Sequence, residues 1–225
     1  MMIAGGVIGG KKPSILFTDA RHNLPANQTT YTVTGISFGP ASSKRRVIVG
    51  VAVATRTGVQ PDQMTIGGVA ATLHDGIAPS GTFSVTVQIW SALVPTGETG
   101  TITMSVPSGD MDGGSLYVFA AYDLRDSAPT DTAADMVFGD PDGTDVSIDV
   151  KAGGVVVAVA ATSNTNPATF SFTGLTVADQ DRSPNFQSAG AYLGNAQSAS
   201  PMHIKAVFTI SAGSFSPSAV AVSWR

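Results

Sequence analysis

Three histidines, His22, His74 and His203, are the side chains of this sequence best suited to acid–base chemistry near neutral pH. None of them stands in the H-x-H or H-E-x-x-H spacing that brings two imidazoles to one metal ion. We therefore interpret each as a surface residue. A triad of serine, histidine and aspartate stays open, because such residues meet in space rather than along the chain.

One segment matches the G-x-S-x-G pattern of a nucleophilic serine, Gly35-Ile36-Ser37-Phe38-Gly39. That pattern works only at a turn from a strand into a helix. Here Ser37 falls in a strand pattern that runs into Pro40, and no helical pattern follows. The match is interpreted as chance in a chain rich in glycine and serine.

A second candidate is the aspartate-rich loop in which Asp140, Asp142 and Asp145 surround Gly143. Carboxylates and loop carbonyls are the ligands that calcium prefers. The spacing is not that of an EF-hand, and a solvated turn is favoured over a calcium site. No catalytic residue, metal ligand or cofactor site is predicted, and the chain is not expected to be an enzyme.

Composition excludes several other classes of protein. Only 12% of the 225 residues are charged, the formal net charge is −4, and cysteine is absent. The basic clusters Lys11-Lys12 and Lys44-Arg45-Arg46 are too short to follow a phosphate backbone, so nucleic acid is not an expected partner. The apolar stretch Ala152 to Ala178 is broken by polar residues and a proline, so we expect no membrane insertion.

Residues 1–13 form a glycine-rich segment whose lysines follow the apolar part, the reverse of a secretory signal. We interpret it as a flexible arm that becomes ordered on a neighbouring subunit. Residues 14–225 are predicted to form an all-β domain, an antiparallel sandwich or jelly roll, because short runs with period-two alternation recur between turn residues. The runs Val47 to Ala54 and Val155 to Ala161 are apolar on both faces and are the predicted core strands.

These two core runs also belong to an internal repeat, with halves at about residues 30–125 and 144–225. Further correspondences pair Gly68 with Gly174, Trp90 with Tyr192, and the segment from Ala121 with the one from Ala221. Asp126 to Gly143 is the predicted linker. The two halves are expected to trace equivalent strands, related by a pseudo-twofold axis or a translation.

Four segments together resemble a family of uncharacterised β-rich proteins encoded among the structural genes of tailed bacteriophages and related prophage or gene-transfer particles. The segments are Thr65 to Thr72, Leu93 to Gly97 with Thr99 to Ile102, Ala152 to Ala160, and Ala221 to Arg225. They are strand and turn motifs, so the family supplies no catalytic residues.

The resemblance implies a structural protein located in the virion, such as a capsid decoration, head-fibre or tail-tip subunit, and a contribution to host-surface attachment is an additional role of such subunits. Its expected partners are other virion proteins, bound through the arm, and further copies of itself in a homo-oligomer. The alternatives are a carbohydrate-binding or adhesin module that recognises a host-surface glycan, and a hydrolase built on a jelly roll. An exposed aromatic or calcium-lined loop would favour the glycan-binding module. A deep pocket that joins a histidine to aspartates would favour the hydrolase.

Overall fold

The computed structural model describes residues 11–55, 58–77, 84–108, 111–137, 143–163, 169–183, 186–209 and 217–225. Within these ranges all regular secondary structure consists of β-strands, and all strand pairs are antiparallel. The predicted all-β class and antiparallel sandwich are confirmed. Over the same ranges, no helix is long and apolar enough to cross a membrane.

In its described residues, the first half of the chain forms nine strands in two sheets. They are β1 (Ser14–Arg21), β2 (Thr30–Ser37), β3 (Arg46–Thr55), β4 (Gln63–Ile66), β5 (Val69–Ala70), β6 (Thr72–Ile77), β7 (Ser84–Leu93), β8 (Thr99–Ser105) and β9 (Met111–Tyr122). One sheet has the order β1-β9-β3-β7-β6 and the other the order β2-β8-β4-β5. Most connections cross from one sheet to the other, as in a jelly roll, whereas β4–β5 and β6–β7 are hairpins within one sheet.

The second half repeats this topology. Its strands are β10 (Asp131–Met136), β11 (Thr144–Val150), β12 (Val155–Thr162), β13 (Thr169–Phe172), β14 (Thr176–Asp181), β15 (Gln187–Leu193), β16 (Ala199–Thr209) and β17 (Ser218–Trp224). The sheets have the orders β10-β17-β12-β15-β14 and β11-β16-β13. Each strand has its counterpart in the first half, with β5 alone unmatched in the described residues, so the predicted duplication is confirmed.

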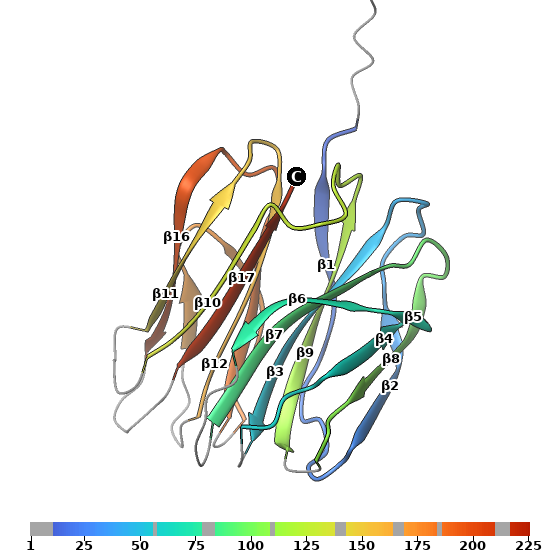
Figure 1. Cartoon of the computed structure of the whole chain (residues 1–225), viewed down its shortest axis with the longest axis vertical. Coiled ribbons are helices and arrows are strands. Elements are labelled where there is room, and N and C mark those ends of the chain that lie inside the picture. Colours follow the sequence, from blue (N-terminus) through green and yellow to red (C-terminus); the bar gives the residue numbers. More distant parts are fainter. Residues whose placement is uncertain are drawn as a thin grey trace, which may run out of the picture.

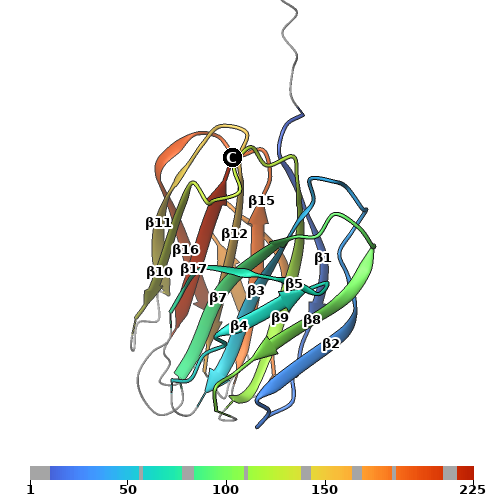
Figure 2. The same cartoon turned by 45° about the vertical axis from the view of Figure 1, so that its right-hand side comes forward.

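The four sheets stack as four layers, and the two five-stranded sheets lie in the middle (Figures 1 and 2). Three apolar cores separate the layers: one inside each half and one between the halves. We call the contact between the five-stranded sheets the central interface. Each half buries the same face of its five-stranded sheet there, which is the geometry of a pseudo-twofold axis and not of a translation.

Val49, Val51, Val157 and Val159 are all 0% exposed, as the apolar runs predict. Strands β3 and β12 occupy the middle of the five-stranded sheets, where each is covered on both faces. Burial of both faces explains why these segments carry apolar residues or glycine at successive positions rather than apolar residues at alternate ones.

The sequence repeat aligns the strands of the two halves in a register that differs from the structural one by an odd number of residues. Val49 packs inside the first half, whereas Val157, its partner in the sequence alignment, packs in the central interface. The turn bond from Arg45 N to Ser42 O is matched by the bond from Gly154 N to Lys151 O. Matching these turns makes Arg45 the counterpart of Gly154.

The same register makes Ala158, inside the second half, the counterpart of Val49. Trp90 likewise packs inside the first half, whereas Tyr192 packs against the central interface. Ala121 packs in the central interface, whereas Ala221 packs inside the second half. A slip of one residue reverses every side chain in a strand. Runs that are apolar on both faces carry no alternation by which the sequence alignment could detect such a slip.

The predicted linker, Asp126 to Gly143, was also wrong in part, because β10 lies within it and pairs with β17. Strand β10 is the counterpart of β1, so the repeated unit includes a strand upstream of each sequence repeat. The first ten residues of the predicted arm lie outside the described residues, and β1 begins at Ser14. The N-terminal end of β1 and the C-terminal end of β17 lie at the same end of the molecule (Figure 1), where Lys12 and Arg225 line one hollow.

Candidate functional site

Polar side chains from both halves meet around His22, which follows β1. Its Nδ1 lies 3.1 Å from Oγ of Ser115 in β9, and its Nε2 lies 3.2 Å from Oδ2 of Asp179 in β14. Asp181, also in β14, approaches Nδ1 at 3.7 Å. A serine, a histidine and two aspartates are thus collected at the edge of the central interface.

The hydrogen-bond directions in this cluster oppose nucleophilic catalysis. Ser115 Oγ donates to Asp181 Oδ2 at 2.6 Å, so the hydroxyl can only accept from His22 Nδ1. The Asp179 carboxylate also only accepts. The bonds of His22 to Ser115 and to Asp179 therefore form together only when both ring nitrogens of His22 carry a proton. A catalytic histidine must instead take a proton from its serine, and Ser115 is 0% exposed.

Tyr117 of β9 closes the cluster on its buried side. The edge of the His22 ring lies against the tyrosine ring, with centroids 5.8 Å apart, and the tyrosine hydroxyl lies 2.8 Å from Oγ of Ser188 in β15. Burial raises the pKa of Tyr117, which keeps the phenol neutral. The His22 cluster therefore acts as a polar contact between the two halves.

His74 of β6 forms a second polar contact with the central interface. Its ring packs edge-on against Trp224 of β17, with centroids 5.4 Å apart. Ser91 Oγ lies 2.6 Å from His74 Nε2 and accepts a 2.9 Å bond from Arg46. The Ser91 hydroxyl keeps its own proton while it accepts from Arg46, so it can donate to His74 Nε2 when that nitrogen is unprotonated.

Burial is the main cause that lowers the pKa of His74 from 6.5 to about 4, and the positive charge of Arg46 lowers it further. The neutral ring agrees with its role as an acceptor. Ser91 is buried, with 1% of its surface exposed, so a substrate cannot reach it. The prediction that the histidines lie on the surface was wrong for His22 and His74, which are both half-buried.

His203 fits the surface prediction: its side chain is 63% exposed, and Nδ1 lies 3.5 Å from Asp145 Oδ2. Of the three aspartates considered for calcium, Asp140 and Asp142 lie outside the described residues. Among the described residues, no group of three or more His, Asp or Glu side chains is arranged to hold a metal ion.

Ser37 ends strand β2, so the G-x-S-x-G segment does not form a turn into a helix. The Ser37 backbone N–H donates to Asp19 Oδ2 at 2.8 Å, and no histidine contacts the hydroxyl. The interpretation of this motif as chance is consistent with that geometry.

The basic cluster of residues 44–46 splits into three separate roles. Lys44 is exposed and Arg46 contacts Ser91, whereas Arg45 is 0% exposed. The Arg45 guanidinium donates to four backbone carbonyls, those of Gly39, Val94, Thr96 and Gly97, over 2.6–2.9 Å. It therefore stabilises two loops at the end of the molecule where residue 11 lies.

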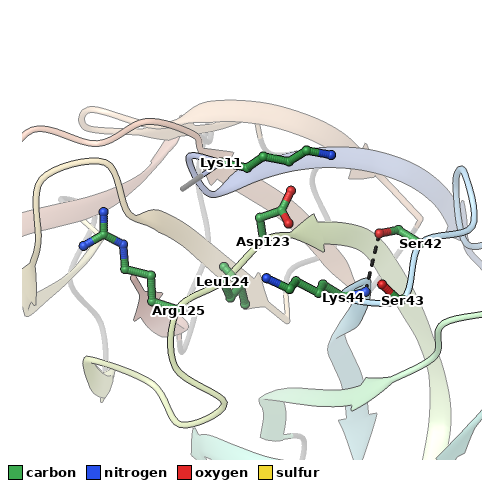
Figure 3. Close-up of a pocket in the computed structure, with 7 residues that line it drawn as sticks. All are labelled: Lys11, Ser42, Ser43, Lys44, Asp123, Leu124 and Arg125. Atoms are coloured by element: carbon green, nitrogen blue, oxygen red, sulfur yellow. Dashed lines mark hydrogen bonds between the residues drawn. The ribbon is translucent and has the colours of Figure 1, made fainter. Parts of the chain in front are cut away.

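Two adjoining hollows mark that same end. The larger, of about 670 Å³, is lined by Lys11, Ser42, Ser43, Lys44, Asp123, Leu124 and Arg125 (Figure 3). The smaller, of about 340 Å³, is lined by Lys12, Pro13, Arg125, Ala152, Gly153, Asn195, Ala196, Gln197 and Arg225. Arg125 borders both, and the linings come from both halves and from the segment that joins them.

Sequence reasoning missed both the His22 cluster and the basic end, which is the group of Lys11, Lys12, Lys44, Arg125 and Arg225 around the two hollows. His22 and Asp179 are 157 positions apart, and no local spacing signals their contact. The short basic runs Lys11-Lys12 and Lys44-Arg45-Arg46 are visible in the sequence, but no pattern shows that Lys11, Lys12 and Lys44 lie beside Arg125 and Arg225. The only available signal was that the loops of these residues lie between predicted strands that end on the same side.

No protein family and no curated protein matches the chain. A crystal structure described as the PBSX exported protein XepA is similar over 92% of this chain and 86% of its own, at 12% identity and a TM-score of 0.27. A TM-score of this size does not support the transfer of a fold or a role from that protein to this one.

Proposed function

We propose that this protein is a non-enzymatic structural subunit of a tailed-bacteriophage particle or a related gene-transfer particle. A location on the head surface, in a head fibre or at the tail tip is compatible with the proposal. The family resemblance of the strand and turn motifs suggests the particle. The structural role rests on how the molecule uses its reactive side chains.

The observation that carries the structural role is the use of two histidine clusters as contacts across the central interface. His22 joins β9 to β14, and His74 joins β6 to β17. Both serines beside them are buried, so neither cluster offers a reachable nucleophile. A four-layer body whose histidine clusters serve as contacts between its halves suits a building block more than an enzyme.

The alternative of a glycan-binding module receives less support. Sugar sites use exposed aromatic rings as platforms, whereas the exposed large hydrophobic side chains of the described residues are aliphatic: Leu16, Val69, Leu73 and Leu93. Neither hollow at the basic end is lined by an aromatic residue.

The proposal is tested on particles purified by density gradient from the cells that encode this chain. Quantitative mass spectrometry is expected to find the protein at a fixed ratio to the major capsid protein, and gold-labelled antibodies are expected to locate it on the head or the tail. Absence from particles that are otherwise complete would refute the proposal. Deletion of residues 1–12 is expected to leave a folded protein that no longer joins the particle.

A further inference from the structure

Five basic side chains gather where the described chain begins and make up the basic end: Lys11, Lys12, Lys44, Arg125 and Arg225. All five are exposed. The chain as a whole carries a net charge of −4, so this end differs in sign from the rest of the molecule. Asp123 is the only acidic residue in the two linings.

The cations of the basic end have no side-chain hydrogen bond or ion pair within the described part of the chain. Other basic residues of the protein are used internally: Arg21 pairs with Asp19, and Arg45 and Arg46 donate to backbone or serine oxygens. In Figure 3 the Lys11 and Lys44 side chains extend along opposite sides of Asp123, and Arg125 extends away from them. The charges are left available to a partner.

The linings identify the chemistry of that partner. No aromatic side chain is present in the two linings to stack on a base or a sugar ring, which disfavours a nucleic acid or a glycan. Arginine guanidinium groups match carboxylates in bidentate geometry, and lysines add point charges. Ser42, Ser43, Asn195 and Gln197 supply further hydrogen-bonding groups for a polypeptide.

We propose that the basic end docks an acidic segment, rich in Asp and Glu, of a neighbouring protein subunit. The segment would cross from the larger hollow to the smaller one and pass Arg125, which borders both. This inference rests on the proposed function, because the neighbour is taken to be another subunit of the particle. Since Lys11 and Lys12 belong to the root of the predicted arm, the arm and the basic end would engage one partner surface.

The test uses the purified full chain and a fluorescent peptide of about twelve residues composed mainly of glutamate. Fluorescence anisotropy is expected to show binding at low ionic strength that weakens at least tenfold in about 0.5 M salt, because exposed charges are screened. The variant Lys44→Glu with Arg125→Glu is expected to bind at least tenfold more weakly than the parent. Lys44→Gln with Arg125→Gln should show a smaller loss.

The matched control is Arg182→Glu with Lys205→Glu, which makes the same charge change away from the basic end. Parent-like binding in this control, with loss in the Lys44 and Arg125 variant, would support the docking surface. Equal weakening in both variants would show an effect of net charge alone and overturn the proposal. Circular dichroism melting confirms that each variant is folded.

Two further measurements separate other partners. A single-stranded oligonucleotide of equal charge is expected to bind more weakly than the peptide, and tighter binding would overturn the choice of a polypeptide. Self-association that is lost only in the Lys44 and Arg125 variant would make the partner a second copy of this chain, which also contradicts the proposal. Absence of the protein from particles would refute the proposed function and leave these binding results unchanged.

Discussion

Gly50 in β3 and Val159 in β12 are counterparts in the two halves, and they face each other across the central interface. A Cβ atom built on Gly50 would overlap with Cγ2 of Val159. The missing side chain in one half therefore makes room for the branched side chain in the other. The pseudo-symmetry is broken at this point so that the two sheets can pack closely.

Gly50→Ala is therefore expected to lower the free energy of unfolding by about 1 to 3 kcal/mol, because overpacking forces the two sheets apart. Urea unfolding followed by tryptophan fluorescence measures the change. The matched control is Gly194→Ala, where the nearest atom to the new Cβ is Cγ2 of Ile15 at 3.4 Å. If the two substitutions cost the same, close contact at Gly50 does not limit the packing.

Val157→Ala should cost about 1 to 3 kcal/mol through loss of two buried methyl groups and the cavity that they leave. Val69→Ala, at a residue 42% exposed, is the control and should change stability by about 0.5 kcal/mol or less. An unchanged urea midpoint for Val157→Ala would contradict the position of Val157 in the core.

Arg45→Met is expected to destabilise the protein by about 2 to 4 kcal/mol, because four carbonyl groups, that of Val94 buried and the other three partly buried, lose their donor. Thermal melting and urea unfolding check this value. Lys44→Met changes the same charge on the neighbouring exposed residue and should have little effect. Similar losses in both variants would show that charge, and not the carbonyl bonds, matters.

The lowered pKa of His74 predicts how stability depends on pH. Between pH 4 and 6.5 the unfolded chain binds a proton at this residue and the folded chain does not, so the free energy of unfolding rises with pH. Acidification from about pH 6.5 to about pH 4 is therefore expected to lower the free energy of unfolding. His74→Gln should flatten that part of the pH–stability curve relative to the parent.

His203→Gln, at a side chain that is 63% exposed, serves as the control for His74→Gln. It should leave the curve close to that of the parent. A His74→Gln curve that coincides with the parent curve would contradict a neutral, buried imidazole at this position.

Ser115→Ala tests whether the His22 cluster is structural or catalytic. We expect a loss of about 1 to 3 kcal/mol in stability, because Asp181 loses a buried donor. Hydrolysis of a panel of esters and glycans should stay at background for the parent, for Ser115→Ala and for His74→Ala. Saturable turnover in the parent that either substitution abolishes would overturn the structural role.

The sequence by itself determined the fold class, the duplication and the identity of the core strands. Alternation of apolar and polar residues is a local property of a strand, and uninterrupted apolar runs mark strands covered on both faces. These signals predicted that Val49 and Val157 are buried. The same apolar runs hid the register, since a strand that is apolar on both faces reads equally well when shifted by one residue.

Only the tertiary structure decided which polar residues meet. His22 reaches Ser115 and Asp179 because β1, β9 and β14 come together at the edge of the central interface, across 157 positions of sequence. Lys44 and Arg125 lie at one end because the connections between antiparallel strands return there in both halves. Contacts of this kind depend on the packing of sheets, which no local pattern of residues encodes.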